Sequence, residues 1–251
     1  MKGVEPMMNG LDACRRTETR AARHDGRVSA MSSWRVRAGK RFVRFAAISI
    51  AALSVSAVAR GFEPPGLFSR EDWAESPAEM PVSQKHVASP DLLLEVWGPG
   101  LHGIKKSNHP WIANDPFYIW SGACPGNWAV SLKHRKNDVD LMGDARIRWR
   151  TRQAGFRELR IILRLADGTW LVSDASDGPS DEWRVREFEL AKIRWRVLDI
   201  SRVSEGKWAA SADLRRVEAV GFTDLVPGGL SDACSRLDWI EVYGRAVDRA
   251  R

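Results

Sequence analysis

Short β-forming segments, separated by Gly, Asp, Asn and Pro, are the feature of residues 91–244 that most restricts the fold. The stretch 146–150 reads Arg-Ile-Arg-Trp-Arg, and 194–197 reads Arg-Trp-Arg-Val. Because side chains alternate between the two faces of a strand, each stretch has one charged face and one apolar face. This alternation is typical of antiparallel strands that are buried on one side.

Ten such segments are predicted to be strands, and none is long enough to form a good helix. An Asp167-Gly168 pair between two of them predicts a hairpin with a type I′ turn, and only Ser211–Arg216 hints at a short helical turn. Without a βαβ rhythm, this pattern predicts an all-β, jelly-roll β-sandwich. The expected strands are 92–97, 117–121, 128–134, 145–151, 158–165, 170–172, 184–188, 194–200, 217–222 and 237–243.

The N-terminal region has the pattern of a secretory signal peptide. Several Arg and Lys residues between positions 35 and 44 precede the apolar run 45–58, which ends in Ala57-Val58-Ala59, an A-x-A cleavage pattern. A membrane anchor is the alternative, but 14 residues of helix span only about 21 Å. We therefore expect a secreted or periplasmic protein that meets the membrane only through this peptide, before cleavage.

Met31 begins the signal peptide, so residues 1–30 are expected to be a misassigned extension. The predicted organisation is then a signal peptide over 31–59, a Pro-rich spacer over 60–90, the sandwich domain over 91–244 and a tail over 245–251. The spacer is predicted because its prolines cannot sustain a helix or a central strand.

The net charge of +7 does not indicate a nucleic-acid partner, because it is concentrated in the leader. Residues 1–60 contain 12 of the 39 Lys and Arg residues but 4 of the 32 Asp and Glu residues. The remaining chain is therefore close to neutral, without the basic surface that nucleic acid requires.

Two cysteines follow the leader, Cys124 and Cys234. In an oxidising compartment they are expected to form a disulfide, which by the chain-entropy model contributes roughly 4–5 kcal/mol. Two buried thiols are the alternative interpretation.

The C-terminal half resembles galactose-binding-like sandwiches. The segments Glu218–Leu225 (EAVGFTDL) and Ser235–Tyr243 (SRLDWIEVY) are similar to the end of family 11 carbohydrate-binding modules and of the complex I intermediate-associated family. The resemblance covers about residues 140–244. It implies a jelly roll of a kind that often binds sugars and often carries a structural calcium ion.

Candidate metal ligands lie within and before these segments. Asp224 and Asp238 are candidates for calcium, although buried ion pairs explain them equally well. The acidic stretch 174–182 is a second candidate, with an acidic surface turn as its alternative.

A long loop between two expected strands is rich in Gly, His and Trp, a composition suited to binding sugars. Its Trp and His rings can stack on a sugar while amide and imidazole groups exchange hydrogen bonds with hydroxyls. The alternative is that the tryptophans only seal the edge of the sandwich. The predicted ligand-binding residues are Trp97, His102, Asn108, His109, Trp111 and Tyr118.

Most other tryptophans fall on expected strands. Trp149, Trp195 and Trp239 lie among alternating apolar positions and are predicted to be core residues, whereas Trp120, Trp128 and Trp183 are not assigned.

These features predict an exported, noncatalytic sandwich that binds carbohydrate or assists polysaccharide processing. One alternative is a glycan-active enzyme, a glycoside hydrolase or a lyase in which His102 or His109 acts as general base and Tyr118 as acid. Another is a structural or protein-interaction sandwich. The sequence contains no G-x-S-x-G, H-E-x-x-H, P-loop or dinucleotide-binding motif.

Overall fold

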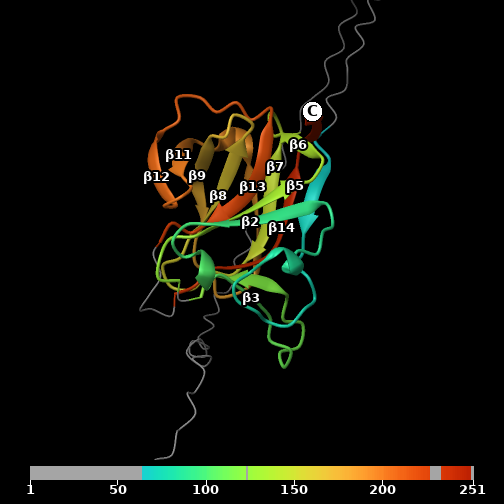
Figure 1. The fold of residues 1–251 in the computed structure, drawn as a ribbon, viewed down its shortest axis with the longest axis vertical. Coiled ribbons are helices and arrows are strands. Elements are labelled where there is room, and N and C mark those ends of the chain that lie inside the picture. The colour runs from blue at the N-terminus through green and yellow to red at the C-terminus, as the bar shows by residue number, and fades with distance from the viewer. Residues whose placement is uncertain (1–63, 123, 227–232, 250–251) are drawn as a thin grey trace, which may run out of the picture. The chain divides into compact units, whose positions relative to one another are not determined.

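The computed structural model describes residues 64–122, 124–226 and 233–249, which belong to one compact unit. The predicted signal peptide and N-terminal extension lie outside these residues. Fifteen strands among the described residues form two antiparallel sheets (Figure 1). The two sheets confirm the predicted jelly-roll β-sandwich. No helix of the described part is long and apolar enough to cross a membrane.

The smaller sheet has six strands in the order β10-β7-β14-β4-β3, with β1 also paired to β14. β14 is therefore its central strand, because it pairs with β7 along one side and with β4 and β1 along the other. The strands of this sheet are β1 (Leu67–Glu71), β3 (Lys105–Ser107), β4 (Tyr118–Trp120), β7 (Arg146–Thr151), β10 (Arg184–Glu189) and β14 (Arg236–Tyr243).

The larger sheet has nine strands, seven of them in the order β12-β11-β9-β8-β13-β5-β2. β6 pairs with β13, and β15 pairs with β6. Three short 3-10 turns lie between strands, η1 (Gln84–His86), η2 (Leu101–Gly103) and η3 (Leu190–Lys192). The strands are β2 (Leu92–Trp97), β5 (Ala129–His134), β6 (Asn137–Asp140), β8 (Leu159–Leu165), β9 (Trp170–Asp177), β11 (Trp195–Asp199), β12 (Ser204–Trp208), β13 (Val217–Thr223) and β15 (Arg245–Asp248).

The core lies between the inner faces of the two sheets. Ile147 and Trp149 from β7 are fully buried and belong to the same cluster as Phe222 from β13 and Trp195 from β11. These are the apolar positions of the alternating segments, and the arginines between them point away from the core. The prediction that Trp149 and Trp195 are core residues is confirmed.

All ten predicted strands are present, with ends that differ by one or two residues in most cases. The β8–β9 hairpin also forms at the predicted place, but its type I′ turn is wrong. That turn needs positive φ at both central residues, and of the pair only Gly168 has it, at 88°. Residues 211–216 contain a turn rather than a helix.

The structure corrects the predicted boundaries of the domain. Residues 64–90 are not a spacer, because β1 pairs with β14 and the Trp73 and Val82 side chains are buried in the core. The predicted tail is also part of the fold, since β15 pairs with β6 from Arg245 to Asp248. Both strands are short, and pairing with strands distant in sequence supplies backbone hydrogen bonds that their own sequences do not predict.

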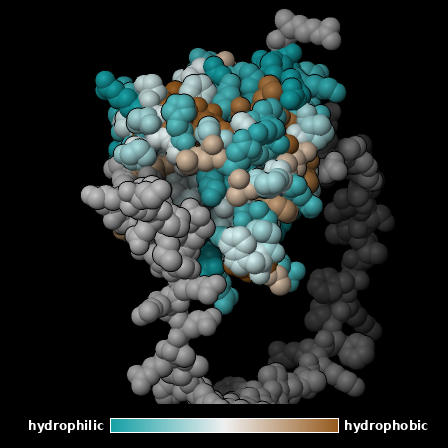
Figure 2. Space-filling view, turned by 60° about the horizontal axis from the view of Figure 1, so that its bottom comes forward, coloured by the Kyte–Doolittle hydropathy of each residue, from teal (hydrophilic) through white to brown (hydrophobic). Residues whose placement is uncertain are grey.

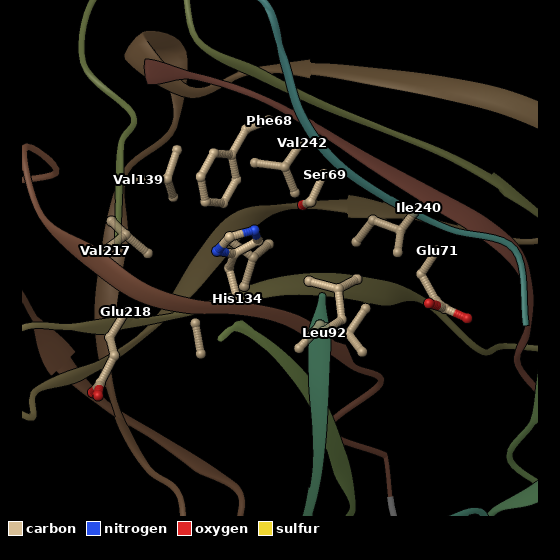
Figure 3. Close-up of a pocket in the computed structure, with 13 residues that line it drawn as sticks. Phe68, Ser69, Glu71, Leu92, His134, Val139, Val217, Glu218, Ile240 and Val242 are labelled. Atoms are coloured by element: carbon tan, nitrogen blue, oxygen red, sulfur yellow. The ribbon is translucent and has the colours of Figure 1, made fainter. Parts of the chain in front are cut away.

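A small cavity lies between β1 and β14 of one sheet and β5 and β13 of the other. Its volume is about 20 Å³, enough for roughly one water molecule. Figure 3 shows Phe68 beside His134 and several aliphatic side chains around it, while the Glu71 and Glu218 carboxylates point away from its centre. This cavity is a packing defect that is too small for a sugar.

A buried ion pair fastens the connection between β13 and β14. The side chains of Arg157 and Asp224 are 1% and 0% exposed, and Nη1 of Arg157 lies 3.0 Å from Oδ2 of Asp224. The guanidinium also donates to the carbonyls of Val226 and Ala233, and the Ser235 hydroxyl donates to Asp224 at 3.0 Å. Burial raises the pKa of Asp224, while Arg157 lowers it.

We predict that Arg157→Met lowers the free energy of unfolding by about 3–5 kcal/mol, because it leaves the Asp224 carboxylate buried without a counter-ion. Urea denaturation measures the loss. Without Arg157 the folded-state pKa of Asp224 rises further above its unfolded value. Protonated Asp224 is then favoured in the folded state. The loss of unfolding free energy caused by Arg157→Met should therefore become smaller as the pH falls from about 7 to about 4.

Arg215→Met is the matched control, because Arg215 pairs with Asp213 on the surface, where their side chains are 72% and 58% exposed. It should change the free energy of unfolding far less than Arg157→Met does, because exposed ion pairs contribute little. Equal losses for the two variants would contradict a special role for the buried pair.

Candidate functional site

The outer face of the six-stranded sheet carries an ordered array of arginine and aromatic side chains. β7 contributes Arg146, Arg148 and Arg150, which register opposite Tyr243, Glu241 and Trp239 of β14. Because alternate residues of both strands fill the core, these six side chains share the opposite face. We call this surface the aromatic–arginine face.

A β-bulge places Trp239 on this face. The register between β14 and β7 shifts between Leu237 and Trp239, so that Asp238 is the extra residue. Leu237 and Ile240 both point into the core, and Trp239 is half-buried on the outside. The prediction that Trp239 is a core residue is wrong, because it assumed uninterrupted alternation, and a bulge shifts the alternation by one residue.

Guanidinium groups stack on the aromatic rings of this face. The Arg70 carbon Cζ lies 4.7 Å from the Trp239 ring centroid, with Arg148 at 5.9 Å. Arg146 lies 4.0 Å from the Tyr243 ring. Such stacking holds each ring in one orientation by cation–π attraction.

The same arginines form ion pairs with carboxylates on the face. Glu241 accepts bonds from Arg70 and from the Tyr243 hydroxyl, and Arg148 lies 3.4 Å away. Arg150 donates to Asp238 at 2.7 Å. Burial raises the pKa of Asp238, and Arg150 opposes that rise. The face therefore presents donors and acceptors side by side with little net charge.

At one end of the face, a group of aromatic side chains surrounds His109. The imidazole Nδ1 lies 2.9 Å from Asp115 Oδ2 and 3.4 Å from the Tyr118 hydroxyl. The rings of Trp111 and Tyr118 lie 5.3 Å and 6.1 Å from the imidazole, and Trp183 packs edge-on against Tyr118 at 5.4 Å. We call these five residues the loop cluster.

The loop cluster joins the aromatic–arginine face through Trp183, whose ring lies 5.5 Å from the Arg150 guanidinium. Trp111 is 66% exposed, whereas Tyr118 is the buried member of the cluster. Burial raises the pKa of Tyr118, so its hydroxyl stays protonated at neutral pH. The cluster thus combines an open indole with a fixed imidazole and a neutral phenol.

Three of the six predicted ligand-binding residues, His109, Trp111 and Tyr118, meet in the loop cluster. Asn108 directly precedes them, and His102 is exposed in η2. Trp97 lies on the other sheet, where its Nε1 donates to Ser131 at 3.0 Å and its ring packs against Trp170. The structure therefore does not unite Trp97 with the others.

The sequence did not single out Trp183 or the arginines as ligand-binding residues. The alternation of arginines over 146–150 already placed them on one face, but nothing in the sequence locates Trp183 above Arg150. That contact depends on the way β10 pairs with β7.

The carboxylates that are candidate calcium ligands form ion pairs with arginines in this structure. Asp224 pairs with Arg157 and Asp238 with Arg150. Within 174–182, Asp177 is buried at the end of β9 and accepts bonds from Trp149, Thr151 and Arg184. No group of three or more His, Cys, Asp or Glu side chains suited to a metal occurs in the described ranges. Calcium binding stays a prediction.

Cys124 and Cys234 are both buried, and no disulfide joins them in the described structure. The Cys124 thiol donates to the carbonyl of Ser121. Burial raises the pKa of Cys124 to about 12, with the Asp224 carboxylate adding to the rise. Since the thiolate is the reactive form, this thiol is unsuited to nucleophilic chemistry at neutral pH.

We predict that iodoacetamide at about pH 8 leaves Cys124 unmodified in the native protein and modifies it in urea without reductant. The raised pKa and the burial both suppress the thiolate in the folded state. Peptide mass spectrometry identifies the labelled cysteine. A Cys124 peptide that reacts in urea only after reduction would instead establish the disulfide predicted from the sequence.

No protein-family model matches the chain, and a search of curated proteins gave no match. Solved structures with a similar fold include the family 11 carbohydrate-binding module of a cellulosomal cellulase from Clostridium thermocellum. That module is 13% identical with a TM-score of 0.44, over 68% of this chain and 97% of the module.

The family 11 module in complex with a β-1,3-1,4-mixed-linked tetrasaccharide gives 14% identity and a TM-score of 0.42, over 70% of this chain and 100% of the module. A family 29 carbohydrate-binding module gives 14% identity and a TM-score of 0.40, over 69% and 98%. The chain is thus similar to jelly-roll modules of these two families.

Proposed function

We propose that the domain is a noncatalytic carbohydrate-binding module whose ligand lies along the loop cluster and the aromatic–arginine face. The observation that carries this proposal is the contact chain from the open Trp111 ring through His109, Tyr118 and Trp183 to Arg150. We call this chain the strip: it links the exposed Trp111 ring and the half-buried His109, Trp183 and Arg150 side chains on one side of the sandwich through Tyr118, which is buried beneath them.

Sugars combine apolar C–H faces with many hydroxyl groups, and this strip offers partners for both. Indole and phenol rings bury apolar surface and still carry a polar group. Arginine side chains donate hydrogen bonds in a fixed, forked geometry, and carboxylates accept hydrogen bonds. An arginine–carboxylate pair can therefore donate to one sugar hydroxyl and accept from another.

The charge balance of the face favours an uncharged glycan. Arg70, Arg148 and Arg150 each face a carboxylate from Asp72, Glu241 or Asp238. An acidic polymer would have to displace these carboxylates to reach the guanidinium groups. A neutral chain can bond to the pairs as they stand.

The coloured part of Figure 2 shows hydrophobic atoms in small patches between hydrophilic side chains. Such a surface differs from the contiguous apolar patches that mark protein or lipid contacts. The face in this view therefore suits contact with a polar ligand.

We predict that Trp111→Ala weakens binding to an uncharged polysaccharide about 10-fold, because loss of one well-placed aromatic contact costs on the order of 1–2 kcal/mol. Affinity electrophoresis in gels that contain mixed-linkage β-glucan, mannan or xylan measures the change, with alginate as the acidic comparison. Trp183→Ala should weaken binding further, because it also releases Tyr118 and Arg150.

Phe156→Ala is the matched control, since Phe156 is another exposed ring, 58% accessible, outside the strip. It should leave binding unchanged. Absence of retardation in every gel, or equal effects of Phe156→Ala and Trp111→Ala, would contradict the proposed function.

A glycan-active enzyme is the second candidate, because Asp115 fixes His109 next to the Tyr118 hydroxyl. In that arrangement the imidazole Nε2 would act as base and the phenol as acid. An enzyme would release new reducing ends or unsaturated sugars from the polysaccharides used in the gels. His109→Ala would abolish that release, whereas a noncatalytic module would show none.

We also propose that the domain is exported and works as an accessory to polysaccharide processing outside the cytoplasm. The predicted signal peptide supports export. Leu53→Arg, which interrupts its apolar run, should retain the chain in the cytoplasm of a bacterial host. Val36→Arg, outside that run, should not. Fractionation with immunoblotting measures this, and identical distributions of the two variants would contradict it.

A further inference from the structure

A concave surface separate from the loop cluster lies at the edge of the nine-stranded sheet. It is an open groove between the β8–β9 hairpin and the residues that follow β12, with a volume of about 610 Å³. This volume lies in the range of roughly 300–1,000 Å³ that is usual for small-ligand sites. The groove is separate from the site described above, because β12 is an edge strand of the nine-stranded sheet, whereas the loop cluster and the aromatic–arginine face belong to the six-stranded sheet. In Figure 1, β12 lies at the upper left of the domain and β3 near its lower end.

We propose that this groove is a second saccharide-binding site that takes an uncharged oligosaccharide. Its apolar lining residues include Leu165, Leu171 and Val197. Its polar lining residues are Asp167, Thr169, Lys207, Ser211 and Asp213. The lining therefore joins an apolar surface to both donors and acceptors, as a polyhydroxylated ring requires.

The backbone around the groove is fixed without a ligand. The Ala209 N–H donates to the Trp195 carbonyl at 2.9 Å, which ties the segment after β12 to β11. On the opposite wall, the β8–β9 hairpin is closed by a bond from the Leu165 N–H to the Thr169 carbonyl, also 2.9 Å. The groove stays open because Ala209 and Ala210 have small side chains, and Ala210 is exposed.

Two of the polar lining side chains are also held in place. Asp167 accepts the Thr169 N–H at 2.8 Å, and Asp213 is held by the Arg215 fork at 2.8 and 2.9 Å. Each carboxylate retains lone pairs for further hydrogen bonds. Fixed acceptors of this kind lose little entropy when they bind hydroxyl groups.

Trp208 is the aromatic residue beside the groove. It is 40% exposed, and the guanidinium carbons of Arg194 and Arg196 lie 4.0 and 4.1 Å from its ring. Because Trp208 pairs with Arg196, its ring lies on the face of the sheet opposite to that of Val197 and Leu171. The stacked arginines hold the indole there, outside the apolar part of the groove.

The charged side chains of the lining also restrict the charge of the ligand. It contains two carboxylates, Asp167 and Asp213, and one ammonium group, Lys207, and Asp213 is paired with Arg215. The lining therefore has little net charge, and a phosphate or a uronate would find no excess of positive charge there. An apolar molecule would bury charged groups without partners. An uncharged, hydroxyl-rich ligand avoids both penalties.

Two sites on one rigid domain would make it bivalent toward a long glycan. Simultaneous contact of one polymer, or of two neighbouring chains, raises the overall affinity above that of either site. This inference rests on the proposed function, because it assumes that the protein recognises carbohydrate.

Calorimetric titration of the protein with cellohexaose and with mannohexaose tests the proposal. We expect about two equivalents bound at saturation for the hexasaccharide that the loop cluster recognises. Trp111→Ala should weaken one of the two binding events about 10-fold and leave the other unchanged.

Ala210→Phe provides a variant that keeps every lining side chain and fills the groove from an exposed position. It should reduce the number of equivalents from about two to about one. Ala191→Phe is its matched control, because Ala191 is an exposed alanine in η3, outside the groove, and it should leave two.

The outcomes separate the two proposals. One equivalent that Trp111→Ala weakens and Ala210→Phe does not affect would overturn the second site and retain the proposed function. No binding of either hexasaccharide, together with no retardation by any polysaccharide, would overturn both.

Discussion

The alternation of side chains along the central strand β14 is the constraint on which the rest of the structure depends. Leu237, Ile240 and Val242 fill the core, while Trp239, Glu241 and Tyr243 form the outer surface. Because β14 pairs with β7, β4 and β1, every strand of the smaller sheet except β3 and β10 takes its register directly from it. The one bulge in this strand, at Asp238, permits two apolar inner residues and an outer tryptophan within four positions.

The sequence predicted most of the fold because alternation is a local signal. Most of the ten predicted strands contain apolar residues at period two. The missed strands include β3 (KKS), β6 (NDVD) and β12 (SEGKW), which are short and charged. Their pairing depends on neighbours distant in sequence, so nothing in their own residues distinguishes them from loops. The predicted spacer failed for the same reason, since β1 exists only as a partner of β14.

The candidate site was predictable in part. His109, Trp111 and Tyr118 are close in sequence, and a loop followed by a strand brings them together. Trp97 comes earlier, at the start of the same loop, and lies on the other sheet, where its indole donates to Ser131. Trp183 joins the cluster across two strands, and Trp239 joins the face through a bulge. Both contacts are set by register, which composition does not encode.

The stacking of guanidinium groups on exposed rings explains how such a face persists without its ligand. An isolated indole on a strand has rotamer freedom that binding would have to remove. Trp239 is held by Arg70 and Arg148, and these arginines are held in turn by Glu241. The indole ring, the guanidinium groups and the carboxylate therefore hold one another in place. The conformational entropy is lost on folding rather than on binding, so even a modest contact area can retain a polar ligand.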